Sequence, residues 1–164
     1  MSSLDLRPTS FGDPVVQRLV DELQAEFTVR YGAPDHTPLD TTTFEPPSGA
    51  FFVGWEGAEP VAIGGWRRRT DVAGFEGSVV TEAKRMYVVP AARGRGLSRV
   101  LLAHLEETAA AAGADVMVLE TGSKQPEAIA LYESSGYTPI PGFGLWKDSP
   151  GNRCFARRLG REHP

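Results

Sequence analysis

The second half of the chain alternates extended and helical segments in an order that few folds allow. Residues 81–89 are rich in side chains that favour extended backbone, and Pro90 ends that strand. A helical pattern over 97–112 stops at Gly113 and is followed by the short apolar run 116–119. That run does not alternate, which is typical of a strand buried on both faces of a parallel sheet. Strand, helix and strand in this order predict a right-handed parallel crossover.

The remaining segments predict an antiparallel first half. Apolar residues at helical spacing follow the N-cap Asp13 and Pro14, and this helix stops at Gly32. Two apolar runs at 50–55 and 61–66 flank a short polar break and predict a hairpin. The other expected elements are an edge strand at 4–7 ended by Pro8, a loop at 32–49, a helix at 126–135 before Gly136, and extended stretches beyond it, the last at 153–156. Together these elements indicate the α/β class.

Length and composition set the class of protein. At 164 residues the chain fits one domain, residues 1–164, because a domain averages about 150 residues. Apolar residues make up 41% and charged residues 23%, which favours a globular protein over a disordered or membrane-spanning one. The first residues lack the basic-then-apolar pattern of a secretory signal, so we expect a soluble, cytoplasmic protein.

Charge and metal-ligating residues narrow the range of partners. Lys and Arg total 17 and Asp and Glu total 21, and the net charge of −4 argues against nucleic acid as a partner. Cys154 is the one cysteine, so no disulfide forms within the chain. The three histidines, His36, His104 and His163, have no metal-ligand spacing. We expect no metal and no membrane partner, and the oligomeric state stays open, with a homodimer as one alternative.

The segment between the predicted strand 81–89 and the helix that follows is rich in glycine and arginine. It reads Arg93-Gly94-Arg95-Gly96-Leu97-Ser98. Its glycines free the backbone to turn, and the unpaired amides and positive end of the helix attract a phosphate. One alternative is a plain turn with solvated arginines. Another is a dinucleotide-binding fingerprint, which requires a third glycine where this chain has Arg99.

Two segments resemble the motifs of one known family. Residues 88–98 resemble motif A of the GNAT superfamily of acyl-CoA-dependent N-acetyltransferases, with Arg93 and Gly96 at matching positions and Ser98 in place of the last small residue. Residues 125–137 resemble motif B of that superfamily. Its matches are Ala128, Tyr132, Gly136 and Tyr137, and Gln125 stands where the family usually has Asn.

The resemblance implies a fold and an activity. The fold is a mixed, mostly antiparallel central sheet flanked by helices, with a parallel strand pair around the acyl-CoA site. The activity is direct transfer of the acetyl group of acetyl-CoA, as cosubstrate, to the primary amine of a small molecule. Two alternatives stay open: a non-catalytic acyl-CoA-binding module, and an enzyme that acetylates a protein N-terminus or lysine.

By the same resemblance, Tyr132 is the general acid that protonates the departing thiolate. The tyrosine also fits a packing role, because Ala128, Leu131, Tyr132 and Ser135 form a core-facing helical stripe. Val88 stands where a backbone amide of the family polarises the thioester carbonyl. The residues that the resemblance assigns to coenzyme binding are Met86, Tyr87, Val88, Arg93, Gly94, Arg95, Gly96, Leu97, Ser98, Thr121, Gln125, Ala128 and Tyr132.

Glu82 is the candidate base, since family members often carry a carboxylate at the start of this strand that accepts the amine proton through a water. On a regular strand Glu82, Lys84, Met86 and Val88 share one face. The alternative is that Glu82 and Lys84 form an exposed ion pair, which contributes less than about 1 kcal/mol.

Four further features have competing interpretations. Arg67–Arg69 follow the expected hairpin and either bind a carboxylate or phosphate of the substrate or lie in a solvated loop. Cys154 fits a small buried residue of the last strand better than an acyl-enzyme nucleophile. His104 shares a helical face with leucines and is expected to pack rather than to catalyse. The aromatic loop 141–146 suits the wall of a pocket.

Overall fold

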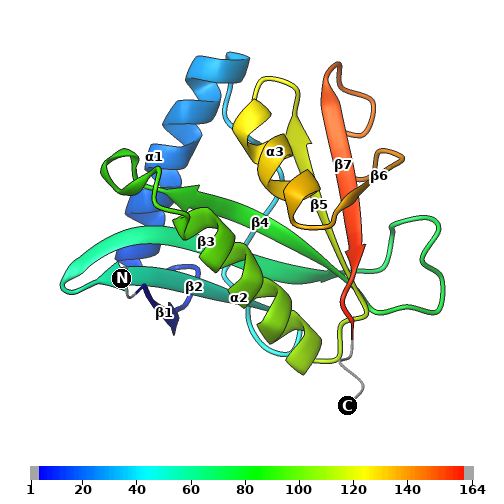
Figure 1. Cartoon of the computed structure of the whole chain (residues 1–164), viewed down its shortest axis with the longest axis horizontal. Helices are drawn as coiled ribbons and strands as arrows, with labels where there is room; N and C mark the ends of the chain where they lie inside the picture. The colour runs from blue at the N-terminus through cyan, green and yellow to red at the C-terminus, as the bar shows by residue number, and fades with distance from the viewer. Residues whose placement is uncertain (1–3, 161–164) are drawn as a thin grey trace. The chain divides into compact units, whose positions relative to one another are not determined.

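The computed structural model describes residues 4–160 and contains seven strands and three α-helices (Figure 1). The elements in chain order are β1 Asp5–Pro8, α1 Pro14–Tyr31, β2 Gly49–Glu56, β3 Glu59–Arg69, β4 Val80–Val88, a 3₁₀ turn Pro90–Ala92, α2 Leu97–Ala111, β5 Val116–Gly122, α3 Pro126–Ser134, β6 Thr138–Ile140 and β7 Asn152–Arg158. Every predicted strand and helix is present. His163 lies outside the described residues.

The strands form one mixed sheet in the order β1-β2-β3-β4-β5-β7-β6. The β1–β2, β2–β3, β5–β7 and β6–β7 pairs are antiparallel. The β4–β5 pair is parallel, with Val80 opposite Val116 and Glu82 opposite Val118. Because α2 joins these two strands, the predicted parallel crossover is confirmed, as is the mostly antiparallel α/β sheet.

The described chain gathers into two compact units. The first holds residues up to Arg67 together with Ala83–Leu105, and the second holds Arg68–Glu82 and the residues from Glu106 onward. Strands β3 and β4 therefore contribute residues to both units. Each unit has its own apolar cluster and is described below by itself.

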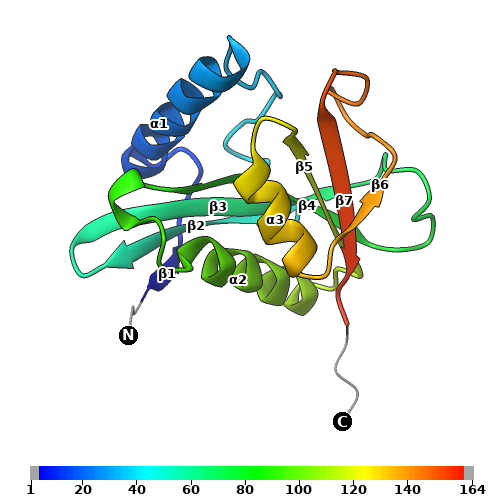
Figure 2. The same cartoon turned by 45° about the horizontal axis from the view of Figure 1, so that its top comes forward.

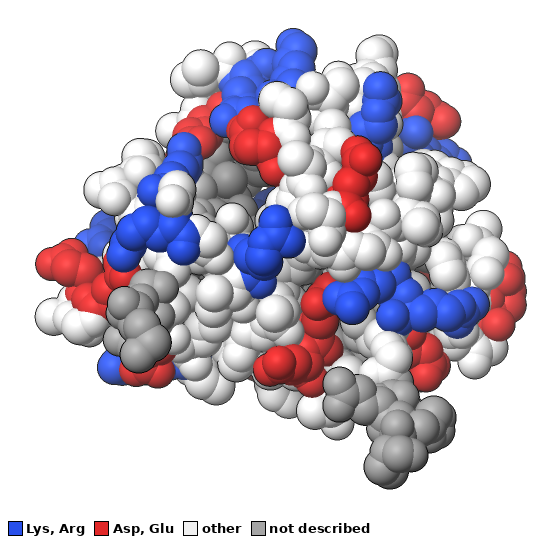
Figure 3. Space-filling model, in the orientation of Figure 1, with Lys and Arg blue, Asp and Glu red and all other residues white. Residues whose placement is uncertain are grey.

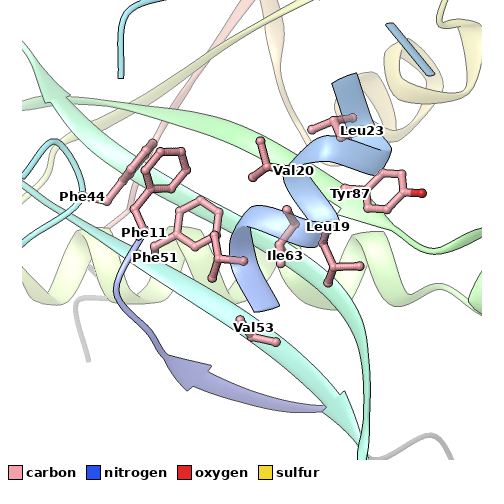
Figure 4. Packing of buried hydrophobic residues seen from close by; sticks show 10 residues of the cluster. Phe11, Leu19, Val20, Leu23, Phe44, Phe51, Val53, Ile63 and Tyr87 are labelled. Atoms are coloured by element: carbon pink, nitrogen blue, oxygen red, sulfur yellow. The ribbon is translucent and has the colours of Figure 1, made fainter. Parts of the chain in front are cut away.

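Helix α1 forms where the sequence predicts it. Asp13 Oδ1 accepts a hydrogen bond of 2.8 Å from the backbone N–H of Val15, which confirms the N-cap. Gly32 ends the helix with a φ of 81°, a left-handed conformation that glycine adopts without the steric cost of a Cβ. The helix buries Val16 and Leu19 in the first unit's core. Figure 4 shows Leu19 of this helix next to Ile63 of β3.

The core beneath α1 is rich in aromatic rings. Phe11, Phe44 and Phe51 meet with ring centroids 4.8–5.1 Å apart, and Figure 4 shows the three rings gathered over the strands. Edge-on and tilted pairs of this kind add about 1 kcal/mol beyond the burial of their area. Phe44 comes from the predicted loop 32–49, so one buried ring anchors that long segment to the sheet.

Helix α2 covers the opposite face of the same strands (Figure 2). Phe52 points to this face and meets the His104 ring edge-on at 4.5 Å, so the predicted packing role of this histidine is confirmed. A close approach of strand and helix is possible because Gly64 has no side chain. A Cβ at Gly64 would lie 3.2 Å from Leu101 and 3.3 Å from Met86.

Strand β4 departs from regular geometry at Arg85, whose φ is 57°. Lys84 and Arg85 are adjacent in sequence, yet both side chains reach Asp35 Oδ2, at 3.5 and 2.6 Å. A regular strand would send them to opposite faces. The expectation that Lys84 shares a face with Met86 and Val88 is therefore wrong, because the backbone changes its alternation between them.

Asp35 holds the loop after α1 against this irregular strand. Its Oδ1 accepts hydrogen bonds from the Thr37 amide and hydroxyl, at 2.9 and 2.6 Å. The side-chain amide of Gln24 pairs with the backbone N–H and C=O of Asp35. Burial alone would raise the pKa of Asp35, but Lys84 and Arg85, together with Thr37, hold it well below its usual range.

The second unit is built on β5, which is flanked by β4 and β7. On one face, α3 packs its Tyr132 ring 6.1 Å from Phe155 of β7. On the other face, Val80, Val116, Val118 and Cys154 form an apolar cluster that Phe143 covers. Both faces of β5 are thus covered, as its unbroken apolar sequence predicts.

The low pKa of Asp35 makes a prediction about stability. Its carboxylate stabilises the fold fully above the unfolded pKa, about 3.9, and that contribution is lost as the pH falls below this value. We expect Asp35→Asn to lower the free energy of unfolding by about 3 kcal/mol at neutral pH, because two buried cations lose their shared partner. The gap between variant and wild type should narrow below about pH 4.

Urea unfolding at a series of pH values measures this gap. Asp5→Asn is the matched control, because Asp5 forms an exposed ion pair with Arg7 and should contribute less than about 1 kcal/mol. The proposed role of the Asp35 carboxylate would be contradicted by either of two results. One is a difference in the free energy of unfolding between Asp35→Asn and wild type that stays constant with pH, and the other is no difference at neutral pH.

Candidate active site

The glycine loop of the first unit joins the end of β4 to the start of α2. Gly94 and Gly96 have φ values of 81° and 78°, and no atom lies within 4 Å of a Cβ placed on either. Glycine is therefore required here by the backbone conformation, and the space above the loop is open. The amide of Val100 donates to the Gly96 carbonyl, which begins the helix. The preceding amides lie at the positive end of α2, a suitable place for phosphate.

Both arginines of the loop form ion pairs within the protein. Arg93 donates 2.9 Å to the Val88 carbonyl and 2.6 Å to Glu26, with its guanidinium over the Tyr87 ring. Arg95 forms a two-bond pair with Glu56 at 2.8 and 2.5 Å. Both side chains also stay exposed, at 43% and 45%, so the alternative of a turn with solvated arginines stays open. Because the guanidinium groups are engaged, the backbone amides are the loop's most available phosphate donors.

Several other predicted coenzyme residues of this unit turn their side chains into the core. Tyr87 belongs to the cluster beneath α1, and Val88 and Leu97 share a cluster beside Ala62. Met86 is partly buried, and Ser98 is exposed at the start of α2. The structure therefore leaves mainly backbone groups for ligand contacts at these positions, apart from the Ser98 hydroxyl.

The remaining predicted coenzyme residues lie in the second unit, around the end of β5 and along α3. Thr121 is buried, and its hydroxyl has no hydrogen-bond partner among residues 4–160. A buried hydroxyl without a partner costs free energy, so it is a candidate ligand contact. Gln125 is the residue before α3, and its side chain does not cap the helix. The shorter side chain of Asn favours such a cap. Ala128 is partly buried on the same helix.

Tyr132 has features that are compatible with both roles considered for it, packing and proton donation. Its ring is packed 6.0 Å from Tyr137 and 6.1 Å from Phe155, and the residue is 8% exposed. Within residues 4–160 its hydroxyl makes no hydrogen bond. Burial raises the pKa of Tyr132 to about 12, so the phenol is protonated at neutral pH. The side chain is therefore a core element with an uncommitted proton donor at its tip.

Glu82 lies in β4 and is 1% exposed. Its Oε1 accepts a hydrogen bond of 2.7 Å from Arg69 Nη1. Arg69 Nε and Nη2 donate to the two oxygens of Asp71, at 2.7 and 2.6 Å. The alternative of an exposed ion pair between Glu82 and Lys84 is wrong, since both side chains are buried.

The arginine run also differs from expectation. Arg67–Arg69 complete β3 rather than follow it. Arg69 is mostly buried and binds carboxylates of this chain, while Arg68 donates 2.7 Å to the Ala112 carbonyl. A solvated loop is therefore the wrong description of these residues. Phe143 of the predicted wall loop 141–146 lies beneath Arg69, at 5.4 Å.

Glu82 and Tyr132 lie on opposite faces of the second unit's strands. Thr81 Oγ1 lies 3.7 Å from the Met117 sulfur, so Thr81 shares the face of β5 that includes Met117 and Leu119. Phe155, which lies opposite Leu119, is on this face, and the Tyr132 ring packs against it. Because strand side chains alternate, Glu82 points to the other face.

Cys154 lies on the Glu82 side of the strands and is buried. Its sulfur is 3.9 Å from Glu120 and 3.5 Å from the Asn152 amide. Burial raises the pKa of the Cys154 thiol, and the carboxylates of Glu120 and Glu82 add to that effect. These surroundings disfavour a thiolate nucleophile and agree with the predicted buried role.

The described residues contain no group of three or more His, Cys, Asp or Glu side chains that could hold a metal ion. None of their helices is long and apolar enough to cross a membrane. On the face shown in Figure 3, both basic and acidic side chains are present.

The sequence of this chain is similar to that of a known protein family and to that of one of its relatives. The profile of the Acetyltransferase (GNAT) family matches residues 16–137. The IAA acetyltransferase of Azospirillum brasilense is 35% identical over 144 residues, which cover 88% of this chain and 90% of that protein.

Two solved structures share the fold. A Klebsiella pneumoniae protein named as an acyl-CoA N-acyltransferase is 26% identical, with a TM-score of 0.78 over 98% of this chain and 100% of that chain. A GNAT family acetyltransferase from Elizabethkingia anophelis with acetyl-CoA bound is 16% identical, with a TM-score of 0.65 over 97% of this chain and 100% of that chain.

The glycine loop generates a prediction about ligand binding. We expect Gly96→Asp to abolish binding of coenzyme A, because two like charges about 4 Å apart repel by about 4 kcal/mol near a protein surface. Gly96→Asn is the matched control: it has the same size, no charge, and tolerates the left-handed conformation. We expect it to weaken binding by no more than about tenfold. Calorimetric affinities that are equal for the two folded variants would refute the phosphate assignment.

Proposed function

Because this chain belongs to the GNAT family of acetyltransferases, we propose that it moves the acetyl group of acetyl-CoA directly to the primary amine of a small molecule. Membership confirms three predictions made from the two motifs: the fold, the class of acyl-CoA-dependent N-acetyltransferase, and acetyl-CoA as cosubstrate. The name of the Azospirillum relative supports a small acceptor.

The open, left-handed glycine loop at the start of α2 is the observation that carries this proposal. Acetyl-CoA supplies an activated thioester when it is bound. The amides around Gly94 and Gly96 would hold its pyrophosphate, because they lie at the positive end of a helix under open space. In the second unit, the buried hydroxyl of Thr121 is a separate candidate for a ligand contact.

Glu82 is the proposed base. An amine with the ordinary lysine-like pKa of about 10.4 is protonated at neutral pH and must lose a proton before it can attack a carbonyl. The carboxylate of Glu82 would accept that proton through a water, because the side chain is 1% exposed and points to the face of the strands opposite Tyr132. Its burial and its bond to Arg69 hold the carboxylate in one orientation, as a base requires.

Tyr132 is the proposed acid. The phenol pKa of about 12 lies above that of an ordinary thiol, about 8.5, so complete proton transfer to a solvated thiolate is unfavourable. A thiolate that forms in desolvated surroundings holds a proton more tightly. The Tyr132 hydroxyl would therefore donate a hydrogen bond to the sulfur as charge develops, and its proton as the bond breaks.

Two alternatives remain distinguishable by experiment. A non-catalytic acyl-CoA-binding module would need the glycine loop but no uncommitted acid, and the free hydroxyl of Tyr132 favours the enzyme. An enzyme that acetylates a protein N-terminus or lysine would use the same chemistry on a larger acceptor. A cytoplasmic location remains part of the proposal, and the oligomeric state stays open, with a homodimer as one alternative.

Removing the Tyr132 hydroxyl tests the acid. We expect Tyr132→Phe to lower kcat by about tenfold to a thousandfold, with a small change in melting temperature, because the ring keeps its packing. The affinity for acetyl-CoA should change little, since the proton moves only in the transition state.

Tyr137→Phe is the matched control for this experiment. Its ring is buried beside Tyr132, but its hydroxyl donates 2.7 Å to Glu106. We expect this variant to lose about 1 kcal/mol of stability and little activity. A fully active Tyr132→Phe enzyme would exclude the acid role and leave the fold and coenzyme site standing.

The pH dependence of Glu82→Gln tests the base. We expect kcat/KM to fall most near neutral pH, where the amine is protonated, and less at high pH, where the amine is already neutral. Steady-state rates with acetyl-CoA across this range measure the effect. A fall of equal size at every pH would point to a binding or folding role instead.

A further inference from the structure

We propose that Arg69, clamped by Asp71, positions the Glu82 carboxylate so that it can serve as the base of the acetyl transfer. The inference rests on the proposed function, because it assigns Arg69 and Asp71 a role in that reaction. Neither residue touches the reacting atoms in this assignment. Both are positioning residues that act through Glu82.

The guanidinium of Arg69 makes three charged hydrogen bonds in fixed directions. Nε and Nη2 bind the two oxygens of Asp71, and Nη1 binds Glu82 Oε1 at 2.7 Å. A two-bond pair fixes the plane of the guanidinium, because both parallel N–H groups must meet the carboxylate. The third bond then fixes where the Glu82 oxygen lies.

Packing holds the arginine in that plane. Its side chain is 11% exposed, and its guanidinium lies 5.4 Å from the centre of the Phe143 ring. Gly144 has a φ of 74°, and a Cβ there would lie 3.5 Å from Arg69 Nη2. The loop 141–146 thus closes over one side of the arginine.

Charge gives Arg69 a second effect on Glu82. A carboxylate that is 1% exposed needs a countercharge, and Arg69 provides one. Other titratable groups on this side of the unit include Asp71, Glu120 of β5, Cys154 of β7 and Arg158 of β7, whose guanidinium lies 5.8 Å from the centre of the Phe75 ring. The hydrogen bonds to Asp71 and the charge of Glu82 raise the pKa of Arg69, although burial alone would lower it. The guanidinium therefore stays charged.

The arrangement allows orientation and charge to be separated. Lysine keeps the charge of Arg69 but has no planar fork, so Arg69→Lys removes orientation alone. Arg69→Gln removes both. Asp71→Asn weakens the clamp while leaving the Arg69–Glu82 bond, and Asp71 is 60% exposed, so this variant should fold.

The experiment measures kcat, KM and the pH profile of kcat/KM for these variants with acetyl-CoA and an accepted amine. We expect Asp71→Asn to lower kcat about threefold to tenfold and Arg69→Lys about tenfold, each with an unchanged KM for acetyl-CoA. Arg69→Gln should also move the acidic limb of the profile to higher pH, because the buried carboxylate loses its countercharge.

Double variants show whether the effects pass through Glu82. In a Glu82→Gln background, Asp71→Asn should cause no further loss of kcat, since the oriented base is already gone. Asp5→Asn is the control, because Asp5 also forms an exposed pair with an arginine and should change nothing.

The outcomes distinguish failure of the positioning role of Arg69 from failure of the base assignment of Glu82. If Glu82→Gln is impaired but Asp71→Asn and Arg69→Lys keep wild-type kcat, the positioning role is overturned and the proposed function stands. Additive losses in the double variant also overturn it, because Arg69 would then act without Glu82. If Glu82→Gln itself is fully active, the base assignment fails and the positioning role fails with it.

Discussion

Strand β4 buries three charged side chains, and the surrounding structure must give each an opposite charge. In the first unit, Lys84 and Arg85 meet at Asp35, with Arg85 in a left-handed conformation. In the second unit, Glu82 meets Arg69. A buried charge without a partner would cost several kcal/mol, which is a large part of the stability of an ordinary domain. The loop after α1 and the end of β3 are thus held by the same electrostatic requirement.

That requirement separates the side chains that support the fold from those that remain available for chemistry. The loop arginines Arg93 and Arg95 are bonded to Glu26 and Glu56, so we propose that ligand binding there depends on backbone amides. Tyr132 differs, because its packed ring carries a hydroxyl without a partner within residues 4–160. A titratable hydroxyl whose pKa is raised by burial, as that of Tyr132 is, is a candidate for catalysis.

Local signals were enough to predict the elements and the glycine loop. The Asp13 cap, the Gly32 stop and the turn before Leu97 each depend on residues within about one helical turn. The parallel crossover followed from element order alone. Family motifs then supplied the site residues of α2 and α3, whose roles still await the measurements described above.

The pairs that set the charged sites were not predictable in this way. Arg69 and Glu82 are 13 residues apart, and Asp35 and Arg85 are 50 apart, so no periodicity links them. The departure at Arg85 follows from a loop that draws two neighbouring side chains to one carboxylate. The propensities of single residues do not indicate this departure or the long-range ion pairs. The predictions of an exposed Glu82–Lys84 ion pair and of a solvated loop at Arg67–Arg69 were wrong because they used local sequence alone.

The most direct test of acetyl transfer is a panel of small primary amines incubated with acetyl-CoA and the purified protein. Released thiol is followed together with the mass of the amine product. The account predicts that at least one amine releases thiol in equal amount to its acetylated form, and that neither appears without protein. Binding of acetyl-CoA with no acetylated product from any amine would contradict the account and indicate a binding module.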